Sequence, residues 1–300
     1  MKLWNKPWTL PEGFFIGGAL MLVGLLLQLI VGPVEWEVFA WPVNGVIMAA
    51  LLLLIAAMYG LRKSVYAFLF IGTYQAAIPT MVYAVALTIV MGLTRQTGHG
   101  SWLNSMLTFW PFVLIYALVA VILGLVVLRQ VRSWAAVGFA IAKFRFSLLF
   151  HLGLFVAMTT ATLGNADMQR VKMVVSKEQP EWRALDERGN VHEMPLGIQL
   201  KKFVMETYED GSPRRYASEI LILTKKEEPT EATVDVNKPV ETGGWKIYQY
   251  GYDTQMGAQS AISILELVSA PWLPAVYTGI YMMLAGAVCM FVLGGRRKRV

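Results

Sequence analysis

Long apolar stretches separated by short charged segments run through most of the chain, and this pattern predicts membrane-crossing helices. A helix needs about 20 apolar residues to cross the hydrocarbon core of a bilayer. Six stretches fit, although the fifth is short: residues 14–31, 43–60, 66–93, 107–128, 146–163 and 273–293. The third is longer than one crossing and contains Gln75 and Pro79, so we expect it to be tilted, kinked or broken.

Residues 165–270 show a different pattern, which is typical of β-strands. Partial alternation flanks a Glu-Asp-Gly turn within residues 197–224, and the design repeats around Thr-Gly-Gly within residues 231–253. Residues 258–268 predict one more strand, and residues 225–232 a charged loop. The sequence places Tyr248, Tyr250 and Tyr252 on one strand face, either as half-buried sheet packing or as a ligand or partner surface.

These patterns predict an α-helical polytopic membrane protein, with about six transmembrane helices and an extracytoplasmic β-rich domain inserted before the last helix. The first three helices fall in residues 1–105, and the fourth and fifth in residues 106–164. The β-rich domain takes residues 165–270, and the last helix with a basic tail takes residues 271–300.

Composition supports a membrane protein, because 56% of the residues are hydrophobic, 15% are charged and the mean hydropathy is +0.51. Residues 165–270 carry a net charge of −4 and the remainder +10, so the basic excess belongs to membrane loops and predicts no nucleic-acid partner. The single cysteine, Cys289, excludes a disulfide within the chain and a CxxC redox pair. Because no CxxCH occurs, the chain does not itself carry covalent c-type haem.

The distribution of basic residues predicts the orientation. With a cytoplasmic N-terminus, the inside segments hold twelve Lys and Arg residues, and the short outside loops hold only Arg95. Both termini are then cytoplasmic, and residues 165–270 lie in a periplasm-like compartment. The first apolar stretch has no small-residue cleavage site after it, so we interpret it as an uncleaved anchor.

His151 is the one titratable side chain between Phe146 and Leu163. With the cytoplasmic end of the helix near Phe146, it lies about 8 Å into the membrane, where an ionisable group costs roughly 2.5 kcal/mol or more. A neutral imidazole can ligate haem iron, and Gly153 would let a flat ring or another helix approach. The alternative is that His151 bonds a helix carbonyl or a serine at a helix contact. Aromatic neighbours that suit a macrocycle are Phe144, Phe146, Phe150 and Phe155.

Two further histidines lie outside the apolar stretches. His99, in a Gly-His-Gly loop near Trp102, is either an outer-face haem contact or an ordinary loop residue, and His192 has the setting of a surface residue at the sheet edge. The β-rich region shows no hydrolase or thiol-redox constellation, so we predict no catalytic residue in this chain.

Five stretches then appear in a familiar order: LTFWPFVLIYALVAVILGLVVLR, HLGLFVAMTTATLGNADMQRVKM, FVMETYEDGSPRRYASEILI, VDVNKPVETGGWKIYQYGYD and APWLPAVYTGIYMMLAG. Together they resemble the ResB-like cytochrome c biogenesis family, over roughly residues 106 to 293. The first 105 residues resemble it less.

The resemblance implies a subunit that helps to carry haem across the bacterial inner membrane and to present it to CxxCH apocytochromes in the periplasm. A CcsA-like multi-span protein would be its partner, and a periplasmic thiol-redox protein is a further candidate. The cofactor would be haem b, held transiently and shared with the partner, and His151 aligns with the intramembrane histidine of the family. The ten Trp residues are dispersed, so this chain would be the B-type, non-catalytic subunit of a haem lyase complex.

Other functions remain open on the residues alone. A scaffold subunit would bind apocytochrome or a redox partner through the β-rich domain and would not touch haem. A transporter should show an inverted repeat and more polar intramembrane groups than Gln75 and His151. A b-type electron carrier would want two buried histidines for each haem.

Overall fold

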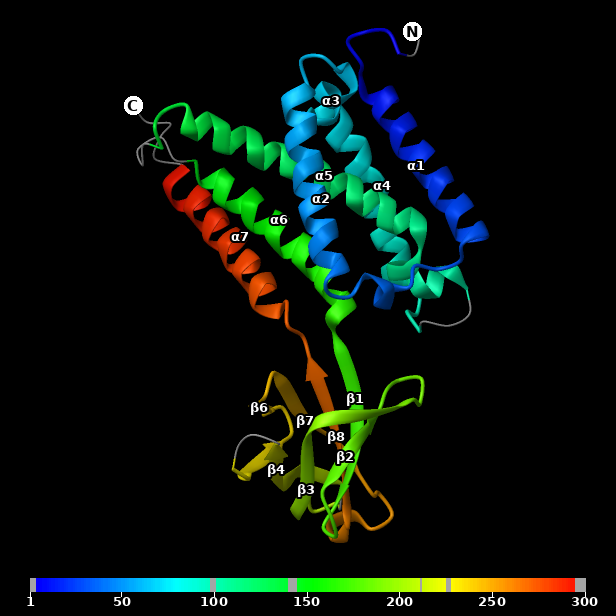
Figure 1. The fold of residues 1–300 in the computed structure, drawn as a ribbon, viewed down its shortest axis with the longest axis vertical. Coiled ribbons are helices and arrows are strands. Elements are labelled where there is room, and N and C mark those ends of the chain that lie inside the picture. Colours follow the sequence, from blue (N-terminus) through cyan, green and yellow to red (C-terminus); the bar gives the residue numbers. More distant parts are fainter. Residues whose placement is uncertain (1–3, 98–100, 140–144, 211, 225–227, 295–300) are drawn as a thin grey trace. The chain divides into compact units, whose positions relative to one another are not determined.

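The chain folds into a helical unit and a β-rich unit in the computed structural model (Figure 1). The structure describes residues 4–97, 101–139, 145–210, 212–224 and 228–294. The helical unit comprises Met1–Ala166 and Trp272–Val300, and the β-rich unit comprises Asp167–Pro271. The fold class predicted from the sequence is therefore confirmed: a helical membrane protein with a β-rich unit before its last helix.

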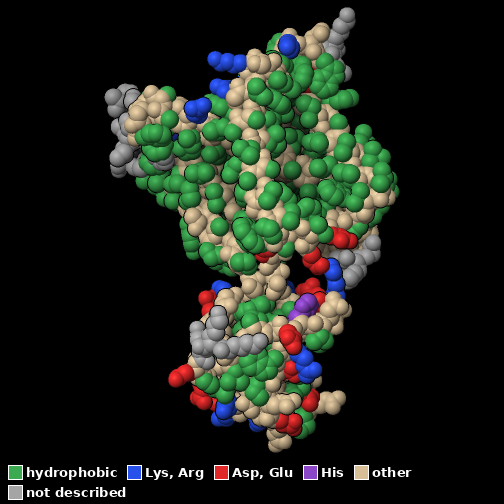
Figure 2. Space-filling view, in the orientation of Figure 1, with side chains coloured by type: hydrophobic (Ala, Val, Ile, Leu, Met, Phe, Trp, Pro, Cys, Tyr) green, Lys and Arg blue, Asp and Glu red, His purple; other side chains and the backbone are tan. Residues whose placement is uncertain are grey.

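Among the described residues, six helices are long and apolar enough to cross a membrane. Hydrophobic side chains cover the visible face of these helices, whereas charged side chains gather on the β-rich unit (Figure 2). The six are α1 (Leu10–Ile30), α2 (Val43–Leu61), α4 (Tyr74–Leu93), α5 (Trp110–Ala135), α6 (Phe146–Gly164) and α7 (Leu273–Gly294).

The expected break in the third apolar stretch is confirmed, because a short helix, α3 (Tyr66–Ile71), ends before α4 begins at Tyr74. Pro79 lies inside α4 rather than at the break. Proline has no N–H to donate to the carbonyl of Gln75, and that carbonyl faces Gly13 of α1. A Cβ on Gly13 would also lie 2.8 Å from the Pro79 ring, so α1 approaches α4 closely here because Gly13 has no side chain.

Helices α6 and α7 run side by side (Figure 1) and meet through small residues. A Cβ added to Gly279 of α7 would lie 2.7 Å from the carbonyl oxygen of Gly153 and 2.8 Å from the Cα of Ala157. One added to Gly286 would lie 2.5 Å from the backbone nitrogen of Phe150. Missing side chains let two backbones approach, which is how helices associate in a membrane without a hydrophobic driving force. Gly153 thus allows helix α7 to approach α6, which is one of the two roles predicted for it.

The β-rich unit is one antiparallel sheet of eight strands within the described residues, in the order β5-β4-β3-β2-β1-β8-β7-β6. β1 and β8 pair from Gln169↔Ser269 to Ser176↔Ile262. The inward faces bury residues such as Met173, Ile198 and Leu265 in one core. The strands are β1 (Gln169–Ser176), β2 (Glu181–Leu185), β3 (Val191–Thr207), β4 (Pro213–Thr224), β5 (Thr230–Asp235), β6 (Val240–Thr242), β7 (Trp245–Tyr252) and β8 (Ile262–Ser269).

The first predicted hairpin is confirmed as the β3–β4 pair, and the strand predicted within residues 258–268 is β8. The second hairpin is shorter than expected. Its Thr-Gly-Gly turn joins β6 to β7, with Gly243 at φ +54° and Gly244 at φ +80°, a left-handed conformation that favours glycine. The residues before this turn form two strands instead of one. β5 pairs with β4, and β6 has only three residues.

The prediction that three tyrosines share one face is wrong for Tyr252. The pairing of β7 with β8 shifts between Gln249 and Gly251, which leaves Tyr250 as an extra residue. Such a bulge reverses the alternation beyond it. Tyr250 is therefore exposed, whereas Tyr252 packs inward against Phe203 and Tyr216, with ring centroids 5.1 Å away in each case.

Candidate functional site around His151

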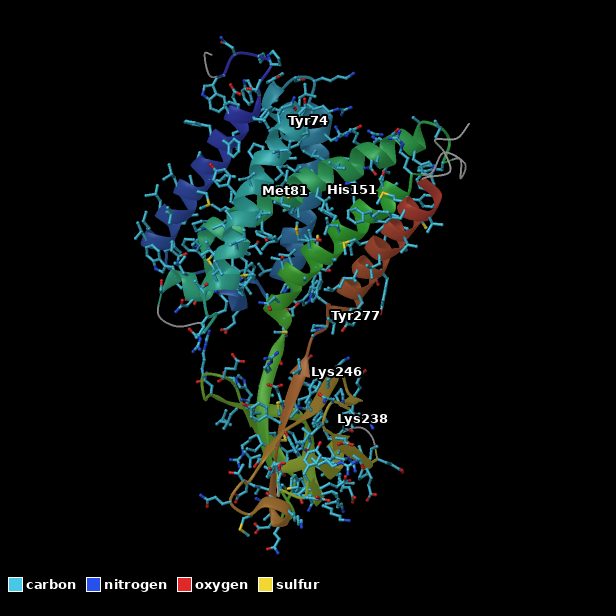
Figure 3. The ribbon with its side chains drawn as sticks, turned by 180° about the vertical axis from the view of Figure 1, so that it is seen from behind. Tyr74, Met81, His151, Lys238, Lys246 and Tyr277 are labelled. Atoms are coloured by element: carbon cyan, nitrogen blue, oxygen red, sulfur yellow. The ribbon has the colours of Figure 1, made fainter. Side chains whose placement is uncertain are left out.

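His151 lies on α6, five residues after the helix begins at Phe146, in the part of α6 that α5 passes (Figure 3). The side chain is half-buried. Its helix is fixed near the other end, where the buried Asn44 of α2 donates through Nδ2 to the carbonyl oxygen of Leu163 at 3.2 Å. The imidazole therefore sits on a helix that is packed along its length rather than on a loop.

One ring nitrogen, Nδ1, makes both polar contacts of His151 among the described residues. It lies 2.5 Å from the carbonyl oxygen of Ser147, one turn earlier on α6. A carbonyl only accepts hydrogen bonds, so a separation this short places the ring proton on Nδ1. Nε2 is then unprotonated in the neutral ring, and its lone pair has no partner in the described part of the chain. The helix-carbonyl contact predicted as the packing alternative is present, and it involves Nδ1 rather than Nε2.

A glutamine from the neighbouring helix completes the polar surroundings. Gln130 of α5 places its amide nitrogen 3.4 Å from His151 Nδ1. Its amide oxygen is buried and has no hydrogen-bond partner. Buried polar atoms without partners are uncommon in folded proteins and call for an explanation. Gln130 was not predicted from the sequence, because it follows Arg129 in a polar helix end and shows no motif.

The aromatic surroundings differ in part from the prediction. Phe150 meets the imidazole edge-on, with ring centroids 5.5 Å apart and an interplanar angle of 87°. Phe155 is instead buried against Gly124 of α5. Phe144 lies outside the described residues. His151 thus has one close aromatic neighbour from α6.

The other two histidines do not belong to the described part of the helical unit. His99 lies outside the described residues. His192 is exposed at the start of β3, where Nε2 lies 3.0 Å from Oδ2 of Asp186. In the described ranges, no group of three or more His, Cys, Asp or Glu side chains is placed to hold a metal ion. His151 is therefore not part of a multi-residue metal centre of that kind among the described residues.

The Asp186–His192 pair gives the β-rich unit a pH dependence. Hydrogen bonds from His192 first, and then from Asn190, hold the pKa of Asp186 well below its usual range. Asp186 therefore stabilises the folded unit above its unfolded pKa of about 3.9, and this contribution is lost as the pH falls below that value. We expect thermal melts of the full chain between pH 7 and pH 3 to lose less stability for Asp186→Asn than for the wild type. Equal slopes below pH 4 would contradict this role.

Comparison with known proteins identifies the segment that contains this site. Residues 145–266 match the family model of the ResB-like family. Over this segment the chain is similar to the ResB-like family. The matched residues begin one position before α6, include His151, and run through the sheet into β8.

Individual relatives agree over a limited part of the chain. The "Cytochrome c biogenesis protein CcsB" of Prochlorococcus marinus subsp. pastoris is 28% identical over 130 residues, which cover 41% of this chain and 29% of that protein. A solved structure, the "Cytochrome c Heme Lyase CcmF", covers 68% of this chain and 33% of its own, at 12% identity and a TM-score of 0.33. That score does not establish a common fold. The chain thus spans about a third or less of the length of these relatives.

Proposed function

We propose that this chain is a membrane subunit of a cytochrome c maturation system and that His151 holds haem during its transfer. The observation that carries the proposal is the free Nε2 lone pair of an imidazole on a membrane helix, inside the segment that matches the family. The name of the curated relative, a cytochrome c biogenesis protein, supports the same process.

The residues around His151 fit haem as a cargo. Histidine is a common axial ligand of haem iron, and the partner that holds Nδ1–H sets which nitrogen faces the metal. Ser147 supplies that partner through its carbonyl oxygen. When bound, haem supplies the iron and the vinyl groups that thioether formation needs. This chain would supply one nitrogen ligand from a membrane helix, and a CcsA-like multi-span partner would provide the second ligand.

The β-rich unit is the part of the chain that would meet the client. The positive-inside bias places it in the periplasm, with both termini in the cytoplasm of a bacterial inner-membrane protein. There, haem b delivered with the partner would be attached to CxxCH apocytochromes. We test the delivery step by purifying the full chain with its multi-span partner and measuring pyridine haemochrome. The proposal expects haem b in the complex, and a haem-free complex that still supports cytochrome maturation would contradict it.

The orientation has its own test. In a Cys289→Ser background, Glu209→Cys marks the exposed β3–β4 turn, and Lys63→Cys marks the exposed segment after α2. We expect a membrane-impermeant maleimide to label the first variant in intact spheroplasts and to label the second only after the membrane is opened. The reverse order of labelling would place the β-rich unit in the cytoplasm.

A scaffold role without haem is the second candidate, and the outer face of the sheet favours it. Tyr250 is 50% exposed there, with Nζ of Lys172 3.8 Å from its ring centroid. Val174, Leu185 and Val191 are exposed on β1, β2 and β3. An exposed apolar patch of this kind marks a contact surface. His151 separates the two candidates, because only the haem-holding role needs its imidazole.

A further inference from the structure

We propose that Gln130 is the positioning residue of His151, and that its amide oxygen shares the Nδ1 proton with the carbonyl of Ser147. This inference rests on the proposed function, because it concerns how the imidazole is presented to haem iron. It assigns a role to a side chain on α5, whereas the ligand itself lies on α6.

The proton of the neutral imidazole lies on Nδ1. Nδ1 has one position in the ring plane for a hydrogen, and the 2.5 Å contact to the Ser147 carbonyl fills it. Nδ1 therefore has no lone pair left to accept a hydrogen bond. The amide nitrogen of Gln130, 3.4 Å away, would direct its own hydrogens at a nitrogen that already carries one.

A half-turn of the Gln130 amide exchanges its oxygen and nitrogen, two atoms of nearly equal size whose assignment follows from their partners. As placed, the oxygen is buried without a partner, while the nitrogen faces a donor. The half-turn replaces the donor-to-donor contact by an N–H···O contact from Nδ1, and the amide nitrogen then takes the buried position that the oxygen held. The amide oxygen of Gln130 then accepts a hydrogen bond from Nδ1–H of His151.

An acceptor on Nδ1–H fixes the orientation of the ring and makes Nε2 a stronger donor to a metal. A stronger donor favours ferric over ferrous haem, so the amide lowers the reduction potential of the bound iron. Removing such an outer-shell partner typically weakens metal affinity by about 10–100-fold. Ser147 contributes a backbone carbonyl, which leaves Gln130 as the side chain that tunes the ligand.

The test compares Gln130→Leu and Gln130→Glu in the full-length complex purified with its partner, with Arg129→Ala as the control on the exposed neighbouring position. We expect Gln130→Leu to retain haem at least tenfold more weakly and to raise its reduction potential, a tenfold change in the ferric-to-ferrous preference being about 59 mV for one electron. Gln130→Glu keeps an oxygen acceptor, so we expect it to retain haem at a potential no higher than that of the wild type. The control should match the wild type.

The other outcomes overturn the inference in distinguishable ways. If Gln130 donates to Nδ1 instead, Gln130→Glu should lose haem as Gln130→Leu does. If Gln130 only packs α5 against α6, Gln130→Leu should leave the Soret band and the potential unchanged and alter the melting temperature alone. If His151→Ala keeps the wild-type spectrum, the proposed function fails, whereas loss of haem in His151→Ala with unchanged Gln130 variants removes only the role of Gln130.

Discussion

Replacing His151 by alanine should abolish most of the Soret absorbance of the purified complex and halt the maturation of c-type cytochromes. The imidazole is the one histidine of the described helical unit, and its Nε2 lone pair is free because Nδ1 is bonded to Ser147. The loss should exceed the roughly 10–100-fold that removal of an outer-shell partner costs, since the metal ligand itself is deleted. The measurement is the absorbance spectrum of the complex at equal protein concentration.

Two further variants make that result specific. His192→Ala removes an exposed histidine of the β-rich unit and should leave the spectrum unchanged. His151→Gly opens space for free imidazole, and millimolar imidazole should restore part of the Soret band. Wild-type spectra and normal cytochrome levels in His151→Ala would refute haem ligation and leave the scaffold role.

Introducing leucine at Gly279 should have the largest effect on stability. Its Cβ would meet the Gly153 carbonyl at 2.7 Å and the Ala157 Cα at 2.8 Å, and both are backbone atoms that cannot rotate away. Overpacking costs about 1–3 kcal/mol and sometimes more, so α6 and α7 should separate in part. We expect the melting temperature of the full chain in detergent, followed by tryptophan fluorescence, to fall by about 5–10 °C.

Gly92 supplies the matched control for this substitution. It also lies inside an apolar helix, α4, but a Cβ there would have no atom within 4 Å. Gly92→Leu should therefore keep the wild-type melting temperature or raise it slightly, because glycine is a poor helix former. If both leucine variants melt alike, the close contact between α6 and α7 does not stabilise the unit.

The length of the apolar stretches was sufficient to predict the membrane helices. The local sequence pattern was insufficient wherever tertiary contacts determine the structure. The stretches 43–60, 146–163 and 273–293 end within one residue of α2, α6 and α7, because charges or turns flank them. Helix α5 continues to Ala135, past Arg129, where hydropathy falls but helix propensity does not.

The sheet and the site show the same limit. β2 has five residues, too few for a clear alternation, and it was not predicted. The bulge at Tyr250 leaves the sequence alternation intact while it turns Tyr252 inward. His151 was predictable as a polar residue in an apolar run. Gln130 was not, because only the packing of α5 on α6 brings its amide to the ring.

The pairing of β1 with β8 determines how early the sheet of the β-rich unit can be completed during synthesis. β1 is the first strand to be made and β8 the last, yet the two are neighbours in the sheet. β1 therefore waits for almost the whole unit to be translated before its partner exists, and contacts so distant in sequence form slowly. β8 is made just ahead of α7, so the sheet cannot be complete until translation has reached the last helix.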